Sequence, residues 1–344
     1  MIHIQTDRID VTLVDSVTTV VFGPSGIGKS TLLKQVAGHL PLKGSLRIAD
    51  EVIEANNESV DAAKRDFSYI AQRLNLIETL TVQQNLTLAV RFSSAQDANE
   101  LAKLMIAMVE IEALLDKRTN QLSGGEYQLV SFCMAMLSGG RWYLFDEPFS
   151  AVDKARKHRV LTRFKHWQRS NKVPILYVTH DAHEMALIAD DVLLMSEETT
   201  KVISYQQLID AVDSEFMTQY ANENIIETKW CSSEDDIQCL TMINSDLKIF
   251  ALGEQPEQKI QWLTIPLADL SISLQPMIQS SILNQLPAII NKIGAQRDGI
   301  CYVSASVGEQ RFTVRITSKS RDELNLKEGL ECFICFKAPK LIES

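Results

Sequence analysis

The 344-residue chain lacks long apolar runs. No stretch approaches the roughly 20 apolar residues that a helix needs to span a bilayer. Residues 1–7, MIHIQTD, also lack a basic segment followed by an apolar one, so a secretory signal is not expected. We therefore expect a cytosolic protein whose membrane role, if it has one, comes through a partner.

The sequence also lacks an excess of basic residues, with a net charge of −10 and a pI of about 5.2. This argues against a protein that binds nucleic acid through a broad basic face, and we expect no nucleic-acid partner. Its hydrophobic content of 45% is ordinary for globular proteins. The length favours two domains over one.

Cysteine is scarce, and only Cys332 and Cys335 have the CxxC spacing of metal and redox sites. They fall in a strand-like run, where positions three apart point to opposite faces. No second CxxC completes a zinc set. We therefore expect reduced thiols in a protein core.

The segment GPSGIGKST at residues 23–31 is a complete phosphate-binding loop between a strand-like and a helix-like segment. Its glycines let the backbone N–H groups wrap a polyphosphate at a helix N-terminus. Lys29 is expected to reach the outer phosphates, and the Ser30 hydroxyl to ligate Mg²⁺. The residues predicted to bind nucleotide are Gly23, Pro24, Ser25, Gly26, Ile27, Gly28, Lys29, Ser30 and Thr31.

Strand-like and helix-like segments alternate over the first 210 or so residues, which predicts an α/β domain with a largely parallel sheet. We place this domain at residues 1–220, with a helical lobe inserted at about 74–138. Residues 3–14 and 43–54 are expected to add a small antiparallel sheet. Short β-like runs separated by turns follow, and they predict a small all-β barrel of OB type at residues 221–344.

Two acids, Asp146 and Glu147, end an apolar strand at residues 141–145. Asp146 fits the Mg²⁺-binding acid of phosphate-loop NTPases, and Glu147 fits a general base for the attacking water. The alternative is an acidic turn after a buried strand. His180 follows another strand, at the sheet edge where ligands bind, and is expected to contact the γ-phosphate and the water. His183 and Glu184 share a helix face with it in a metal-like spacing, without a further ligand.

The order of these segments resembles the ATP-binding subunits of ABC transporters over residues 1 to about 210. Residues 23–31 match Walker A and residues 146–147 match Walker B. The matches to the other motifs are Gln72 for the Q-loop, Ser123, Gly124 and Gly125 for the signature, Asp153 for the D-loop and His180 for the switch histidine. The resemblance implies catalytic roles for Glu147, His180 and Gln72, and Mg²⁺ ligation by Ser30, Gln72 and Asp146.

The same resemblance implies a homodimer in which ATP lies between one subunit's Walker A and the other subunit's signature. It also implies a membrane-embedded permease that contacts the helical lobe, and an attached periplasmic or extracellular binding protein. The chain would then sit at the cytoplasmic face of the membrane. The family usually stacks an aromatic side chain on adenine, but residues 1–21 contain no Phe, Tyr or Trp. The choice between ATP and GTP is therefore open.

Residues 275–340 resemble a Mop-type oxyanion-binding domain, which follows the ATPase in molybdate-importer subunits. The resemblance rests mainly on the run SSILNQL at 280–286. Ser280, Ser281 and Asn284 offer hydroxyl and amide donors for an anion such as molybdate. The alternative is a polar turn that packs against a β-barrel.

We therefore expect the ATPase subunit of a molybdate importer, with tungstate as a second substrate. Importers of sulfate, iron or sugar share this architecture and are the alternative. A soluble ABC ATPase that acts on nucleic acid or the ribosome usually carries two ATPase units or long coiled-coil insertions, and this sequence has neither. A molybdate-storing module would not need Walker motifs.

Overall fold

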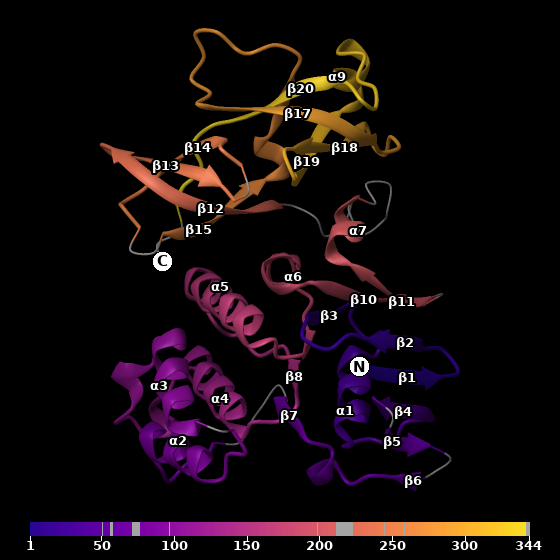
Figure 1. The fold of residues 1–344 in the computed structure, drawn as a ribbon, viewed down its shortest axis with the longest axis vertical. Coiled ribbons are helices and arrows are strands. Elements are labelled where there is room, and N and C mark those ends of the chain that lie inside the picture. Colours follow the sequence, from indigo (N-terminus) through magenta and orange to yellow (C-terminus); the bar gives the residue numbers. More distant parts are fainter. Residues whose placement is uncertain are drawn as a thin grey trace. The chain divides into compact units, whose positions relative to one another are not determined.

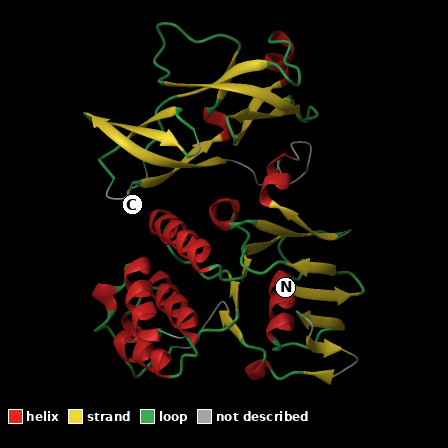
Figure 2. Ribbon diagram, viewed as in Figure 1, coloured by secondary structure: helices red, strands yellow, loops and turns green. Residues whose placement is uncertain are grey.

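The computed structural model describes residues 1–49, 51–55, 58–70, 76–95, 97–197, 199–210, 223–243, 245–256 and 259–341. The chain forms two compact units, Met1–Tyr205 and Gln206–Ser344 (Figure 1). Figure 2 shows helices and strands mixed in the first unit and mainly strands in the second. Within the described ranges, no helix is long and apolar enough to cross a membrane.

The first unit is built on a six-stranded sheet in the order β11-β10-β3-β9-β8-β7. All neighbours are parallel except β10 and β11. Every residue of β3, β8 and β9 is buried. These strands are mostly apolar, as expected for a parallel sheet that is covered on both faces. The strands are β3 (Thr18–Phe22), β7 (Phe67–Ile70), β8 (Trp142–Asp146), β9 (Ile175–Val178), β10 (Asp191–Met195) and β11 (Thr200–Ser204).

A second, antiparallel sheet in the order β2-β1-β4-β5-β6 belongs to the same unit and agrees with the strands expected near residues 3–14 and 43–54. Its strands are β1 (Ile2–Thr6), β2 (Asp10–Leu13), β4 (Gly44–Ile48), β5 (Glu51–Ala55) and β6 (Glu58–Ser59). Side chains from it share one core cluster with helix α1 and the parallel sheet.

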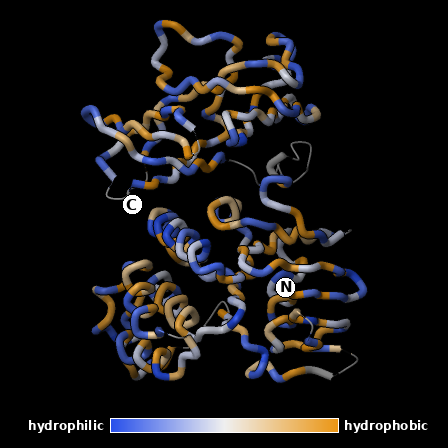
Figure 3. Tube along the Cα trace, viewed as in Figure 1, coloured by the Kyte–Doolittle hydropathy of each residue, from blue (hydrophilic) through white to orange (hydrophobic). Residues whose placement is uncertain are grey.

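The helices of the first unit include the three-helix lobe α2, α3 and α4, seen as the violet group in Figure 1. Helix α5 is largely hydrophilic in Figure 3, whereas α6 is largely hydrophobic. The α-helices are α1 (Lys29–Ala37), α2 (Val82–Arg91), α3 (Ala98–Val109), α4 (Gly124–Ser138), α5 (Lys154–Asn171) and α6 (Ala182–Ile188). Helix α7 (Tyr205–Asp210) spans the boundary between the two units. The short 3-10 turns are η1 (Ala62–Lys64), η2 (Glu112–Leu114) and η3 (Thr119–Gln121).

A buried aromatic cluster fixes α4 to the parallel sheet and to α5. The ring of Phe132 on α4 lies 4.9 Å from that of Phe149 and 5.0 Å from that of Phe164 on α5, between centroids. Its ring also packs 5.3 Å from Phe145, next to Asp146 at the end of β8. Aromatic packing therefore holds the lobe against the strand end that carries the two acids.

The second unit contains two antiparallel sheets, in the orders β14-β13-β12-β15 and β16-β20-β17-β18-β19, around one shared core. This agrees with the small all-β domain expected from the sequence. The strands of the first sheet are β12 (Glu223–Glu234), β13 (Ile237–Met242), β14 (Lys248–Leu252) and β15 (Ile260–Pro266). The other elements are η4 (Leu267–Asp269), β16 (Ser271–Ser273), β17 (Asn284–Ile293), β18 (Ile300–Val307), β19 (Gln310–Thr317), α9 (Ser318–Glu323) and β20 (Glu331–Phe336).

Two asparagines join these sheets in the same way. The amide of Asn224 on β12 accepts from Thr313 N and donates to Thr313 O on β19, both at 2.8 Å. The amide of Asn284 on β17 accepts from Phe250 N at 2.7 Å and donates to Phe250 O at 2.9 Å on β14. Because β14 and β19 are edge strands, each asparagine satisfies backbone groups that the ladder leaves unpaired.

Cys332 and Cys335 are buried, reduced thiols, as expected.

Candidate nucleotide site

The phosphate-binding loop lies between β3 and α1, in the middle of the parallel sheet. Gly28 is the residue before the helix and has φ 105°, in the left-handed region that glycine adopts without strain. The helix then begins at Lys29, so its first N–H groups face the loop. The loop and the helix start therefore have the form expected of an anion-binding turn.

Lys29 is 7% exposed and turned into the loop. Its ammonium donates to Gly23 O at 2.7 Å and to Pro24 O at 2.9 Å. Burial lowers the pKa of Lys29, and the nearby carboxylates of Glu147 and Asp146 partly oppose that shift. A cation held among these groups is matched to a multiply charged anion such as a triphosphate.

Ser30 and Asp146 meet across the sheet edge. The Ser30 hydroxyl donates to Asp146 Oδ1 at 2.8 Å. The contact forms because β9 alone separates β3 from β8, and parallel strands end at the same edge. Burial raises the pKa of Asp146, and the Ser30 hydrogen bond opposes the rise. The hydroxyl oxygen of Ser30 and the carboxylate oxygen of Asp146 are the type of ligand that Mg²⁺ prefers.

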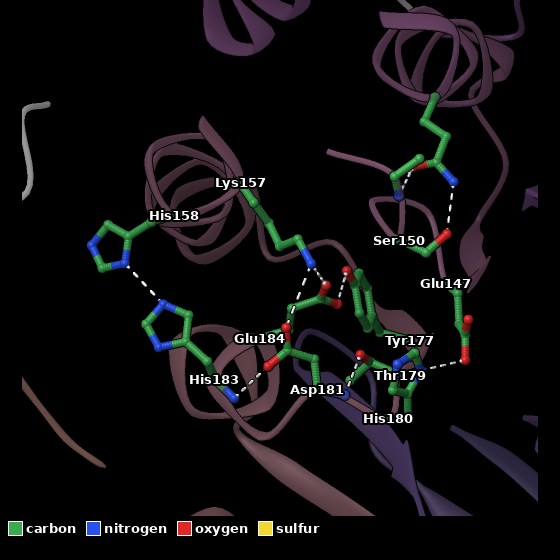
Figure 4. Close-up of polar contacts among 12 residues, drawn as sticks. Glu147, Ser150, Lys157, His158, Tyr177, Thr179, His180, Asp181, His183 and Glu184 are labelled. Carbon is green, nitrogen blue, oxygen red and sulfur yellow. Dashed lines mark hydrogen bonds and ion pairs between the residues drawn. The ribbon is translucent and has the colours of Figure 1, made fainter. Parts of the chain in front are cut away.

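Glu147 and His180 form the second contact at this edge. His180 Nδ1 lies 2.8 Å from Glu147 Oε1 (Figure 4). Glu147 has φ 49°, left-handed for a residue with a side chain, and its N–H donates to Val178 O at 3.0 Å. Strained backbone of this kind gathers at functional sites. The Glu147 carboxylate therefore lies beside the His180 imidazole and one residue after Asp146.

The signature residues begin α4. Ser123 is its N-cap, where its hydroxyl accepts from Glu126 N at 3.2 Å and its N–H donates to Glu126 Oε2 at 2.7 Å. Gly124 and Gly125 follow in the first turn, which leaves the helix N-terminus without bulky side chains. Within the described residues, no hydrogen bond joins Ser123, Gly124 or Gly125 to the phosphate-binding loop. Asp153 caps the next helix, α5, by accepting from Arg156 N at 3.0 Å.

The three residues noted for metal-like spacing face different partners (Figure 4). His180 contacts Glu147, while His183 Nε2 lies 3.1 Å from His158 Nδ1. Glu184 is paired with Lys157 Nζ at 2.7 Å. These side chains therefore do not converge on one point. Gln72 lies outside the described residues.

The three oxyanion candidates in the second unit have different surroundings. Ser280 and Ser281 are exposed in the loop before β17, and the Ser280 hydroxyl accepts from Ile282 N at 3.1 Å. Asn284 is 1% exposed, and its amide oxygen and nitrogen are both engaged by Phe250. The serine hydroxyls thus face solvent, whereas the asparagine amide lies between the two sheets.

Sequence reasoning missed two residues that bind neighbouring loops. Gln128 on α4 contacts the backbone and side chain of residues 150–151, and Lys157 on α5 contacts the segment after His180. Gln128 follows Gly125 by three positions and so lies on the same helix face, the one signal that the sequence contains. Nothing comparable marks Lys157.

Both units of the chain resemble known proteins. The profile of the ABC transporter family matches residues 6–150, and that of the TOBE domain matches residues 280–342. The molybdenum import ATP-binding protein ModC of Saccharophagus degradans is 30% identical over 349 residues, covering 97% of this chain and 94% of its own length. ModC of Pseudomonas savastanoi pv. phaseolicola is 31% identical over 343 residues, with 97% and 94% covered.

Solved structures with the same fold are more distant in sequence. A dimeric ATP-binding cassette bound to ADP and Pi in a post-hydrolysis state is 23% identical, with a TM-score of 0.50 over 58% of this chain and 90% of its own. A nucleotide-free cassette from an ABC transporter is 16% identical, with a TM-score of 0.52 over 62% of this chain and 91% of its own. The fold and site thus define an ATP-binding cassette of the ABC transporter class. Within that class, the chain belongs to the family of molybdenum import ATP-binding proteins.

Proposed function

We propose that the chain is the ATPase subunit that energises molybdate import through a membrane permease. The observation that carries the proposal is the pairing, at one sheet edge, of Ser30 with Asp146 and of Glu147 with His180. The near full-length similarity to molybdenum import ATP-binding proteins supports the choice of substrate. Tungstate, with the same tetrahedral shape and charge, is the second substrate.

In the proposed reaction the phosphate-binding loop and Lys29 hold the triphosphate of ATP. Ser30 and Asp146 supply the oxygen ligands for Mg²⁺, together with Gln72. Bound there, Mg²⁺ neutralises charge on the phosphate oxygens.

Glu147 takes a proton from the attacking water as the water oxygen bonds to the γ-phosphorus, and the bond from that phosphorus to the bridging oxygen breaks, so that ADP leaves. His180 orients the Glu147 carboxylate through their 2.8 Å contact. Because the carboxylate is fixed before the water arrives, little reorganisation is needed when the reaction begins.

The signature residues serve the partner subunit in this proposal. The helix N-terminus after Ser123 presents free N–H groups that attract a phosphate. Gly124 and Gly125 keep that end open, and Asp153 lies beside the shared nucleotide. Two copies of the chain therefore close on ATP, and closure moves a permease at the cytoplasmic face of the membrane. A periplasmic or extracellular binding protein delivers the substrate.

The second unit is proposed to bind the transported oxyanion as a regulatory ligand. Ser280 and Ser281 supply exposed hydroxyl donors before β17. Asn284 fixes the end of this loop against β14 through its two bonds to Phe250. Calorimetry of the full chain with molybdate, tungstate and sulfate tests this part, and absence of heat with all three would remove it.

Uptake of labelled molybdate tests the proposed function. Deletion of the gene should abolish uptake at nanomolar molybdate, and the wild-type gene should restore it while Glu147→Gln does not. Intact molybdate uptake together with lost uptake of sulfate, iron or a sugar would assign the ATPase to a different importer.

A further inference from the structure

A series of polar contacts begins at Gln128 on α4 and runs from the loop at Ser150 through Lys157 to the His180–Glu147 pair. Figure 4 labels its members from Ser150 onward. The Gln128 side chain donates through Nε2 to Ser150 Oγ at 2.8 Å. Its Oε1 accepts from Ala151 N at 2.7 Å. Both ends of the amide are therefore committed to the loop between β8 and α5.

The same loop is held by a backbone contact one helical turn earlier. A Cβ placed on Gly125 would lie 2.8 Å from Ala151 O, closer than side chains tolerate. Glycine at this position lets α4 approach the loop, and Gln128 then bonds to it. The first turn of α4 and residues 150–151 consequently form one rigid contact.

Helix α5 starts directly after this loop and makes the next contact. One turn after the Asp153 cap, Lys157 Nζ lies 2.7 Å from Glu184 Oε1 and 3.5 Å from Asp181 Oδ2. The side chains of Lys157 and Glu184 are 10% and 3% exposed, and Tyr177 OH donates to Glu184 Oε2 at 2.8 Å. A buried ion pair of this kind is specific in geometry, because loss of one partner leaves a buried charge.

Both acids, Asp181 and Glu184, follow His180 in the chain. Asp181 follows His180, its N–H donates to Thr179 Oγ1 at 3.0 Å, and its Oδ1 accepts from His183 N at 2.9 Å. The backbone on both sides of His180 is thereby fixed. The His180 ring then meets Glu147, which closes the series of contacts at the site of hydrolysis.

We propose that Gln128 and Lys157 are positioning residues that tie the signature helix to the His180–Glu147 pair within one subunit. The inference rests on the proposed function, since it assigns these residues to ATP hydrolysis. Through this chain, a shift of the signature helix is carried to the orientation of His180. The partners of Gln128 and Lys157 lie outside the phosphate-binding loop, so we expect their effect to fall on turnover and to leave ATP binding intact.

A double-mutant cycle tests the proposal on the full chain. Gln128→Leu and Lys157→Met are each expected to lower kcat about tenfold, with KM for ATP changed by less than about twofold. The double variant should lose little more than either single one, because both break the same chain. Losses that multiply to about 100-fold in the double variant would overturn the proposal.

Two further variants separate positioning from folding. Lys157→Arg keeps the charge and should restore kcat to within about threefold of wild type. Asp181→Asn retains the cap oxygen and removes one ion pair, so it replaces Lys157→Met in the cycle if that variant does not fold. Lys319→Met on α9 is the matched control and should match wild type, because the Lys319 side chain is 82% exposed and forms a surface ion pair with Glu323. A wild-type chain that hydrolyses no ATP would instead contradict the proposed function itself.

Discussion

The hydroxyl of Ser30 donates to Oδ1 of Asp146 at 2.8 Å, although 116 residues separate the two in the sequence. The start of α1 and the end of β8 thus present two oxygen donors to one point. Since β9 lies between β3 and β8 in the sheet, the loop that carries His180 ends at the same edge. The arrangement of three strand ends therefore creates the site.

Asp146→Asn should weaken Mg²⁺ binding, because an amide oxygen is a neutral and poorer ligand than a carboxylate. We expect the Mg²⁺ concentration for half-maximal ATP hydrolysis to rise at least about tenfold. Titration of phosphate release against MgCl₂ measures it. An unchanged Mg²⁺ requirement would show that Asp146 is not a ligand.

Asn284→Ala and Asn224→Ala should each destabilise the second unit by about 2 kcal/mol, because each leaves an edge-strand N–H and C=O unpaired. Native-state hydrogen exchange of β14 and β19, followed by mass spectrometry, measures the loss. Asn291→Ala is the control, since Asn291 is exposed and its Oδ1 accepts from the Ser306 hydroxyl on the same sheet. Equal stabilities for all three variants would contradict the bridging role.

The contribution of Glu110 to the free energy of unfolding should depend on pH. Two hydrogen bonds from Arg159, at 3.0 and 2.9 Å, with the charges of Arg163 and Arg156, lower its pKa below the usual 4.5. A lowered carboxyl pKa stabilises the fold above pH 4.5, and this contribution is lost as pH falls through the lowered value. Glu110→Gln should therefore cost about 1–2 kcal/mol at pH 7 and reduce the loss of stability at acid pH.

Urea unfolding at pH 7 and at several values below 4.5 measures both effects. Glu100→Gln on α3, the helix that ends just before Glu110, is the matched control, because its ion pair with Lys103 is 73–74% exposed. If Glu110→Gln and Glu100→Gln gave the same curves, the cluster would have no net effect on stability.

Base selectivity should be low. Residues 1–21 contain no aromatic side chain, and stacking on a base is worth about 1–3 kcal/mol where it occurs. We expect kcat/KM for ATP and GTP to differ by less than about fivefold. Steady-state phosphate release with each nucleotide decides the point, and a preference above about 50-fold would require a selective contact elsewhere.

Much of the nucleotide site could be predicted from the sequence because its residues follow strand ends. The strand expected at residues 141–145 is β8, which is shifted by one residue and so includes Asp146. Local patterns cannot show contacts across long separations. The hydrogen bond from Asn224 to Thr313 spans 89 residues. Nothing in the sequence around either residue distinguishes the Asn224 amide from an exposed one. For Gln128 the sequence offers only its spacing of three from Gly125, which does not reveal that its partners are the backbone and a serine of another loop.

The most direct test of the central claim is phosphate release by Glu147→Gln beside wild type, with dimer formation followed by size-exclusion chromatography in ATP. The account predicts at least about a 100-fold fall in hydrolysis, since a general base is lost. It also predicts an ATP-bound dimer that persists, because glutamine keeps the shape of the site. Turnover near the wild-type rate would contradict the account.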